Sequence, residues 1–181
     1  MTDSASPVPP GFETTMLPHL DAAYNLARWL LHQQQDAEDA VQDAYLRAQR
    51  SFHTFRGSDG RPWLLTIVRN VCYSRLRQNR RATPAEEFDE DLHGTVVHPA
   101  ERNAIDWREI RAAKLQAALE SLTPEFREVI VLHEIEGLAY RDIAAVAEIP
   151  IGTVMSRLAR ARQKLEAALK ASAQQESPHE L

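Results

Sequence analysis

Apolar residues recur at three- and four-residue steps along most of this chain, which is the period of an amphipathic helix. The first such stretch opens at Leu17-Pro18 and has its apolar positions at Leu20, Ala23, Tyr24, Ala27, Leu30 and Leu31. A second runs from Asp36 to Arg50 and has its apolar positions at Ala37, Ala40, Val41, Ala44, Tyr45 and Ala48. A third runs from Pro62 to about Gln78. Since no segment alternates as a strand does, the pattern predicts an all-α fold.

The stretch Thr83–His98 interrupts this periodicity. It is acidic and contains few large apolar residues, so it cannot bury enough surface to fold alone. We therefore expect two small helical domains, over residues 12–82 and 105–173, joined by a flexible acidic linker over residues 83–104.

Four helices are predicted in the second domain. They run to about Leu119, from Thr123 to about Gly137, from Tyr140 to Ala147 and from Ile151 to Ala171, and Glu148-Ile149-Pro150 breaks the last two apart. Thr123-Pro124-Glu125 supplies a cap residue, a proline at the first helical position and an acid in the first turn. Gly137 suits a left-handed helix stop.

The last two of these helices have the spacing of a helix-turn-helix, whose second helix enters the major groove of duplex DNA. The buried positions expected in the two helices are Ile143, Ala144, Ala147, Val154 and Leu158. Ile149 and Ile151 are expected to fill the corner between them. The motif therefore predicts binding to duplex DNA.

Charge is distributed unevenly, and this changes the meaning of the net charge of −5. The segment Arg56–Arg81 holds seven arginines and one acid, and Gly152–Lys164 holds four cations and no acid. Local charge, not the total, governs attraction to phosphate. Two basic surfaces are therefore predicted on an acidic protein.

The last helix carries the candidate contacts with duplex DNA. They are Thr153, Ser156, Arg157, Arg160, Arg162 and Lys164. Ser156 and Arg160 lie one turn apart and can reach base edges, whereas the other cations suit the phosphate backbone. The N–H groups of Gly152 and Thr153 are expected to be free for a phosphate. A surface helix with solvated charges is the simpler alternative, and the unbroken run of cations disfavours it.

The helix from Pro62 combines arginines with aromatic rings, as a binding site for single-stranded nucleic acid does. Its candidate contacts are Arg56, Arg61, Trp63, Arg69, Asn70, Tyr73, Arg75 and Arg77. Core packing is an equally good interpretation of Trp63 and of Phe52, so both interpretations stay open for these two rings.

The helix from Asp36 is acidic on a segment that has no cation before Arg47. Acids in a first turn are favourable to the helix dipole, which is the structural explanation. The polar positions continue beyond that turn, so a basic protein partner explains them better. The candidate contacts with that partner are Asp36, Glu38, Asp39, Gln42, Asp43 and Tyr45.

The sequence gives little support for disulfide bonding, metal binding or catalysis. Cys72 is the single cysteine, so no intrachain disulfide is possible. A buried helix position is the commoner setting for such a thiol than redox sensing. The seven histidines show no metal-ligand spacing, and no glycine-rich phosphate loop is present. We predict no enzyme, no catalytic residue, no metal, no cofactor and no membrane insertion.

Four motifs in order resemble regions 2 and 4 of extracytoplasmic-function sigma factors of the sigma-70 family. They are DAEDAVQDAYLRA, FRGSDGRPWLLTIVRNVCYSRLR, LESLTPEFREVIVLHEIEGLAYRDIA and IPIGTVMSRLARARQKL. The resemblance extends from about Phe12 to Ala171. It implies a cytoplasmic protein with core RNA polymerase, promoter DNA and an anti-sigma factor as partners.

The resemblance also implies a role for each surface. Asp36–Arg47 would dock on the clamp helices of the largest polymerase subunit, and Arg61–Arg77 would recognise and melt the −10 element. The helix from Ile151 would bind the −35 element, although Met155 and Ala159 depart from the residues common in relatives. A helix-turn-helix regulator that binds duplex DNA without polymerase remains the alternative, but it leaves the acidic helix and the arginine–aromatic helix unexplained.

Overall fold

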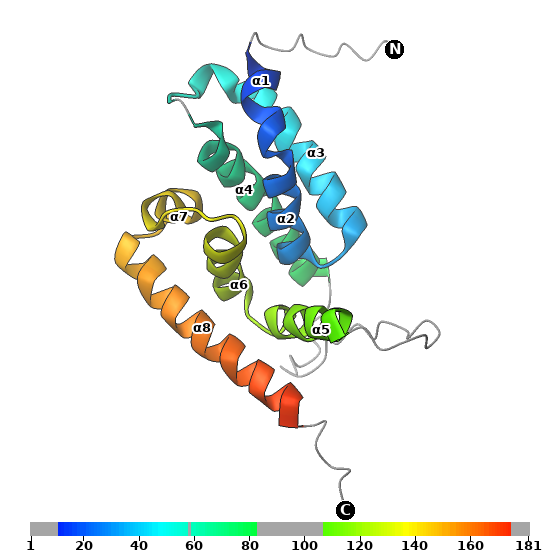
Figure 1. The fold of residues 1–181 in the computed structure, drawn as a ribbon. Helices are drawn as coiled ribbons and strands as arrows, with labels where there is room; N and C mark the ends of the chain where they lie inside the picture. Colours follow the sequence, from blue (N-terminus) through cyan, green and yellow to red (C-terminus); the bar gives the residue numbers. More distant parts are fainter. Residues whose placement is uncertain (1–10, 58, 83–106, 175–181) are drawn as a thin grey trace, which may run out of the picture.

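The structure is a computed structural model that describes residues 11–57, 59–82 and 107–174. Every regular element in these ranges is a helix, which confirms the all-α prediction (Figure 1). The first half contains α1 (Phe12–Met16), the 3-10 turn η1 (Leu17–His19), α2 (Leu20–Leu31), α3 (Gln34–Ser51), the 3-10 turn η2 (Phe52–Thr54) and α4 (Gly60–Ala82). The second half contains α5 (Trp107–Glu120), α6 (Pro124–Ile130), the π-helical turn η3 (Val131–Ile135), α7 (Tyr140–Ala147) and α8 (Ile151–Gln174). The predicted linker lies outside the described residues.

Alanines explain how α3 fits between its neighbours. Ala37, Ala40, Ala44 and Ala48 are all fully buried, at the spacing the sequence predicted. Because their side chains are single methyl groups, the backbone of α3 can approach both α2 and α4 closely. Leu64, Leu65, Val68, Val71 and Cys72 complete this core from α4.

The helix predicted to open at Leu17 is α2, which begins at Leu20, and the short helix α1 precedes it. Phe12 and Met16 are fully buried in α1, and Pro18 lies in the η1 turn that separates α1 from α2. Gly60 begins α4 at the point where it meets α1. A Cβ there would lie 2.9 Å from both Met16 Cε and Thr15 Cγ2 and 3.1 Å from Thr15 O, so the close approach favours glycine.

The helix-turn-helix forms at the predicted residues, with α7 ending at Ala147 and α8 beginning at Ile151. Ile149 packs against the core as expected, but the corner prediction was wrong for Ile151, which is 48% exposed. Side chains of a helix tilt towards its N-terminus, so the first residue of α8 points beyond the turn that packs on α7.

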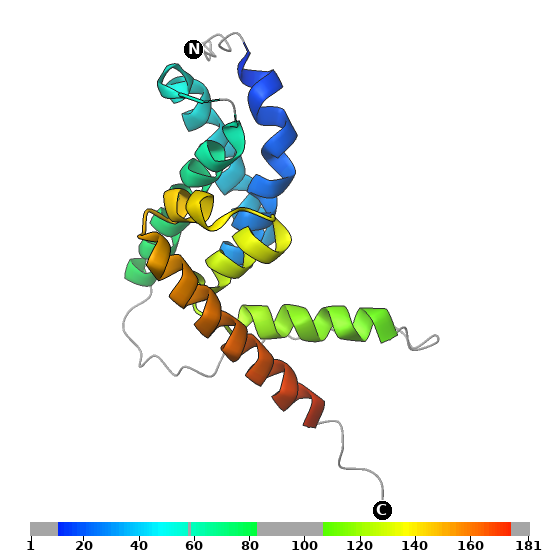
Figure 2. The same ribbon diagram turned by 60° about the vertical axis from the view of Figure 1, so that its left-hand side comes forward.

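The two halves of the molecule pack against each other. α7 lies along α4, and α2 contacts both α6 and η3, as Figures 1 and 2 show from two directions. The buried run Arg127–Leu132 follows from this arrangement, since α6 is covered by α2 on one side and by α8 on another. Sequence periodicity did not predict this contact between the halves.

Candidate nucleic-acid and polymerase interfaces

Three aromatic rings gather where α4 begins. Phe52 stacks on Phe55 with ring centroids 5.7 Å apart, and Phe55 lies 5.5 Å from Trp63. All three rings are half-buried and pack against the core. Trp63 and Phe52 therefore contribute to the core, as one of the two interpretations predicted, and each ring also keeps some surface exposed. Arg56 is exposed beside them and donates to the backbone oxygens of His53 and Phe55.

In the middle of α4, Arg69 and Tyr73 share a carboxylate from the other half of the molecule. Arg69 Nε donates to Glu128 Oε1 at 2.5 Å, and Tyr73 Oη donates to Glu128 Oε2 at 3.0 Å. The Arg69 guanidinium also lies 4.5 Å from the centre of the Tyr73 ring. Burial raises the pKa of Glu128, and the charge of Arg69 works against that rise. Burial and the nearby Glu128 carboxylate also raise the pKa of Tyr73.

A second carboxylate of the C-terminal half reaches the start of α4. Arg61 Nη2 donates to Glu136 Oε2 at 2.5 Å, and Asn25 of α2 donates to Glu136 Oε1 at 2.9 Å. Glu136 is buried, whereas the Arg61 side chain is 31% exposed, so this ion pair lies at the edge of the contact between the halves.

The other candidates on α4 face outward or towards α3. Asn70 and Arg77 are exposed. Arg75 Nη2 donates to Asp43 Oδ2 of α3 at 2.8 Å, and both side chains remain partly exposed. This ion pair joins the candidate −10 surface to the candidate polymerase surface.

The acidic side chains of α3 lie opposite its buried alanines. Glu38 and Gln42 are exposed, while Asp36, Asp39 and Asp43 are half-exposed. Tyr45 differs from these five because its ring packs edge-on against Phe12 at 4.9 Å. The acidic face proper therefore consists of the first five candidates, with Tyr45 placed towards α1.

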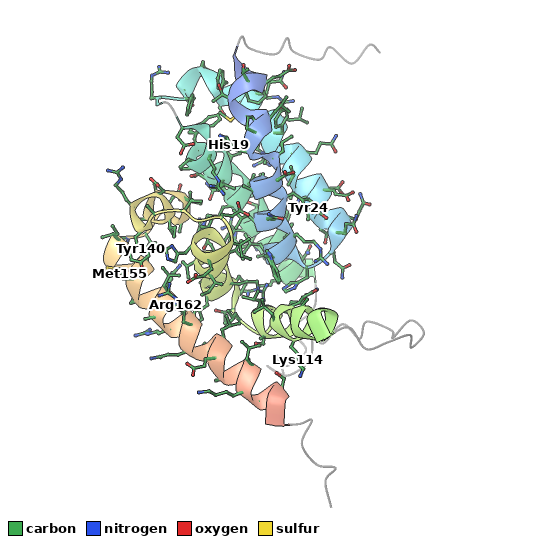
Figure 3. All side chains as sticks on the ribbon, in the orientation of Figure 1. His19, Tyr24, Lys114, Tyr140, Met155 and Arg162 are labelled. Carbon is green, nitrogen blue, oxygen red and sulfur yellow. The ribbon has the colours of Figure 1, made fainter. Side chains whose placement is uncertain are left out.

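On α8, Ser156, Arg160 and Lys164 form an exposed stripe with one residue per turn. Arg160 forms no hydrogen bond or ion pair within the described ranges. Figure 3 shows Met155 at the start of the helix, where its side chain is 54% exposed. The stripe thus presents a polar and cationic surface, as the sequence predicted.

The remaining candidate residues of α8 are less accessible to DNA, because they are half-buried or already have partners within the chain. Arg162 donates to Glu134 Oε1 at 2.6 Å, and this pair is about half exposed. Arg157 is half-buried, and its charge, like that of Arg69, opposes the rise in the pKa of Glu128 that burial causes. The expectation of a free N–H at Thr153 was wrong, because this group donates to Pro150 O at 2.9 Å and so closes the first turn.

Arg127 is a structural residue that sequence periodicity did not reveal. It is 3% exposed, and its guanidinium donates to the carbonyl oxygens of Leu119, Glu120, Leu122 and Trp29 and to His32 Nε2. Burial lowers its pKa to about 10, so it remains charged at neutral pH. Glu128 and Glu136 were missed for the same reason, since their partners lie far away in sequence.

Two further observations concern the described part of the chain as a whole. None of its helices is long and apolar enough to cross a lipid bilayer. Nor do its histidine, cysteine and carboxylate side chains form a group of three or more that could hold a metal ion.

A helix-turn-helix together with a second arginine-rich helix fits the class of DNA-binding transcription proteins. Comparison with known proteins identifies the family within this class. The chain matches sigma-70 region 2 over residues 16–82 and sigma-70 region 4 over residues 112–165. It is 36% identical over 156 residues to the ECF RNA polymerase sigma factor SigE of Mycolicibacterium smegmatis, covering 86% of this chain and 60% of that protein. It is also 31% identical to the RNA polymerase sigma-H factor of Pseudomonas aeruginosa, covering 87% and 86%.

Solved structures agree with these sequence matches. The sigma factor RpoE of Bartonella quintana, in complex with the anti-sigma factor NepR, aligns with a TM-score of 0.69 at 32% identity. That alignment covers 88% of this chain and 96% of RpoE. CnrH in complex with the cytosolic domain of CnrY aligns with a TM-score of 0.64 at 27% identity, covering 88% of each chain. The chain belongs to the extracytoplasmic-function sigma factors of the sigma-70 family. A regulator that carries only the helix-turn-helix does not account for the region 2 match.

Proposed function

We propose that this chain binds core RNA polymerase and directs it to promoters, where it recognises two DNA elements and stabilises the opened −10 strand. The observation that supports the proposal is the presence in one chain of two different candidate DNA-binding surfaces. One is the arginine–aromatic face of α4, and the other is the outward stripe of α8 in a helix-turn-helix.

Residues 12–82 form the domain that binds polymerase and the −10 element in this proposal. The acidic face of α3, formed by Asp36, Glu38, Asp39, Gln42 and Asp43, docks on a basic surface of the polymerase. On α4 and just before it, the rings around Trp63 offer stacking surfaces and the arginines attract the phosphates. Stacking of exposed bases on such rings offsets the few kcal/mol that unstacking of the duplex costs.

Residues 105–173 form the domain that binds the −35 element, with residues 83–104 as the connection. Ser156 and Arg160 of α8 read base edges in the major groove, and Lys164 and Arg162 contact phosphates. Binding at this site fixes the position of the −10 surface along the DNA. The protein acts by binding alone, without a chemical step of its own.

The proposed setting is the cytoplasm, with an anti-sigma factor as regulator. Support for that partner comes from the relatives, since RpoE of Bartonella quintana and CnrH were both solved as complexes with the proteins NepR and CnrY.

Run-off transcription tests this proposal. The purified chain and sigma-free bacterial core polymerase would be incubated, together and separately, with a pool of randomised promoters. Transcripts that require both components are the expected result, and their sequences would reveal both promoter elements. Sequence-specific duplex binding by the chain alone, without any complex with core polymerase, would contradict the proposal.

A further inference from the structure

The second helix of the helix-turn-helix carries two large apolar side chains on its outside. Ile151 is 48% exposed and Met155 is 54% exposed. They lie four residues apart and so share one face of α8, and the exposed Ala159 continues this apolar row by one more turn. Val154 and Leu158, by contrast, are buried and pack α8 on the core. The apolar row is therefore not needed to hold the helix in place.

A polar row runs beside the apolar one. It consists of Ser156, Arg160 and Lys164, which are all exposed. Because successive helical residues are turned by about 100°, the two rows lie on either side of the direction that points away from the core. The surface that α8 offers to a DNA groove is thus half apolar and half polar. The proposed function assigns a task to the polar half alone.

The chemistry of the major groove indicates what an apolar row can contact there. Base edges present hydrogen-bond donors and acceptors, and their one apolar group is the C5-methyl of thymine. An apolar side chain placed against a donor or acceptor would displace water without replacing its hydrogen bond. Against the methyl group it removes water from two apolar surfaces. The flexible side chain of Met155 also adapts easily to an uneven surface.

The position of the row on α8 fits contact with bases. In a helix-turn-helix the N-terminal residues of the second helix reach the base edges. Ile151 is the first residue of α8, and Met155 lies one turn later, at the same end of the helix (Figure 3). The two residues are about 6 Å apart along the helix axis, which is close to the rise of two base-pair steps. The row can therefore reach methyl groups of neighbouring base pairs.

We propose that Ile151 and Met155 select thymine in the −35 element through contact with its C5-methyl group, beside the base that Arg160 reads. Single exposed apolar residues are common on protein surfaces, but these two stand together where the helix meets the bases. The inference rests on the proposed function, because it takes α8 as the helix that binds the −35 element.

Uracil substitution tests the inference, because deoxyuridine pairs with adenine as thymidine does and lacks only the methyl group. The promoter selected by run-off transcription would be prepared with each −35 thymine replaced in turn, while the −10 element keeps its thymines. The complex of the full-length chain with core polymerase would be titrated on each duplex by fluorescence anisotropy. At one or two −35 positions, the loss of the methyl group should weaken binding by about fourfold, as expected for one buried methyl group.

Variants then show whether this side-chain row causes the effect. Met155→Ala should bring the thymine-to-uracil ratio of affinities close to one at a sensitive position, and Ile151→Ala should do so at the same or the adjacent position. Met155→Leu should retain the ratio, because it keeps an apolar side chain of similar size. Leu115→Ala is the control, since it removes a side chain that is 44% exposed on α5, outside the helix-turn-helix. It should leave the ratio unchanged.

Three results would overturn the inference. They are a selected −35 element without any A·T pair, a ratio of one at every −35 thymine in the wild type, and a ratio that neither alanine variant of the row changes. The last result would trace the methyl effect to the shape of the DNA itself.

Loss of the proposed function would have a different signature. If no promoter gave polymerase-dependent transcripts, the sigma-factor function would be lost. The same uracil series on duplexes that the chain alone selects from a random pool would then decide the inference about Ile151 and Met155. Polymerase-dependent transcripts without any methyl effect would retain the proposed function and remove the inference alone.

Discussion

The two proposed DNA-binding helices differ in how their cations are used. On α4, Arg61, Arg69 and Arg75 all donate to carboxylates, and the Arg69 pair is almost completely buried. On α8, Arg160 and Lys164 are exposed, and the ion pairs Arg162–Glu134 and Lys170–Glu166 both lie at the surface. An arginine-rich helix in a sequence therefore does not by itself indicate a surface that is free to bind DNA.

This difference has a physical reason. A buried ion pair has lost its water, so separating its partners leaves two unsolvated charges unless the interface opens completely. An exposed pair is screened by solvent and exchanges easily with phosphate. The free chain should consequently bind duplex DNA through α8 more readily than it binds single strands through α4.

Removal of the Arg127 side chain is expected to have the largest effect, because it loosens the contact between α6 and the end of α2. Replacing Arg127 by Ala leaves several backbone carbonyl oxygens without their donor, so we expect a loss of about 3–5 kcal/mol in the free energy of unfolding. Urea unfolding followed by circular dichroism would measure it. Arg141→Ala, at an exposed position of α7, is the control and should stay within about 0.5 kcal/mol. Equal losses in both variants would show that Arg127 is not an anchor.

The second prediction tests whether Arg160, on the exposed stripe of α8, contacts a base. If Arg160 reads a guanine, Arg160→Ala should relax −35 specificity at a cost of about 1–3 kcal/mol. The measurement is run-off transcription from promoters that differ in single −35 base pairs. Lys164→Ala is the matched contrast on the same stripe, and it should weaken all promoters alike and lower the salt slope by about one. Uniform weakening by Arg160→Ala would reassign this arginine to phosphate.

A smaller effect concerns the core beneath α4. Burial raises the pKa of Cys72 to about 12, whereas an unfolded thiol titrates near about 8.5. The raised folded pKa means that this contribution to stability is complete below about pH 8.5 and is lost as pH rises towards 12. Between pH 8.5 and 9.5 the wild type should lose about 1 kcal/mol more stability than Cys72→Ala. Parallel pH profiles for the two proteins would contradict this.

The same burial predicts that Cys72 is a poor redox sensor. Thiol reagents should modify it slowly in the native chain and rapidly in denaturant. Fast native modification would place the thiol at an open surface instead.

The smallest effect is expected at the exposed ion pair between Glu134 and Arg162, in contrast to the buried pair between Arg69 and Glu128. Removing the charge of Glu134 by Glu134→Gln should change the free energy of unfolding by less than about 1 kcal/mol, because the pair with Arg162 is solvated. It should also strengthen duplex binding slightly, since Arg162 becomes available to phosphate. Fluorescence anisotropy at several salt concentrations would measure this, and a large loss of stability would contradict the comparison.

Local patterns in the sequence predicted most of the helices. The period of Ala37, Ala40, Ala44 and Ala48 identified the buried side of α3 before the structure did. The break at Glu148-Ile149-Pro150 located the end of α7 and the start of α8 to the residue. These features depend on neighbours three or four residues away, which the sequence displays directly.

Long-range pairs could not be predicted in this way. Arg69 and Glu128 are 59 residues apart, and Arg61 and Glu136 are 75 residues apart. Nothing near Glu128 indicates which cation it meets, because that depends on how α6 is placed against α2 and α4. The predictions of a free N–H at Thr153 and of a buried corner position for Ile151 were wrong for a local reason. Residue type alone does not specify the backbone geometry of the first turn of α8.

The docking of α6 and α7 on α4 has a consequence for how this contact depends on protein concentration. Because both partners belong to one chain, dilution does not separate them. The contact between the halves is therefore expected to have the same strength at every protein concentration.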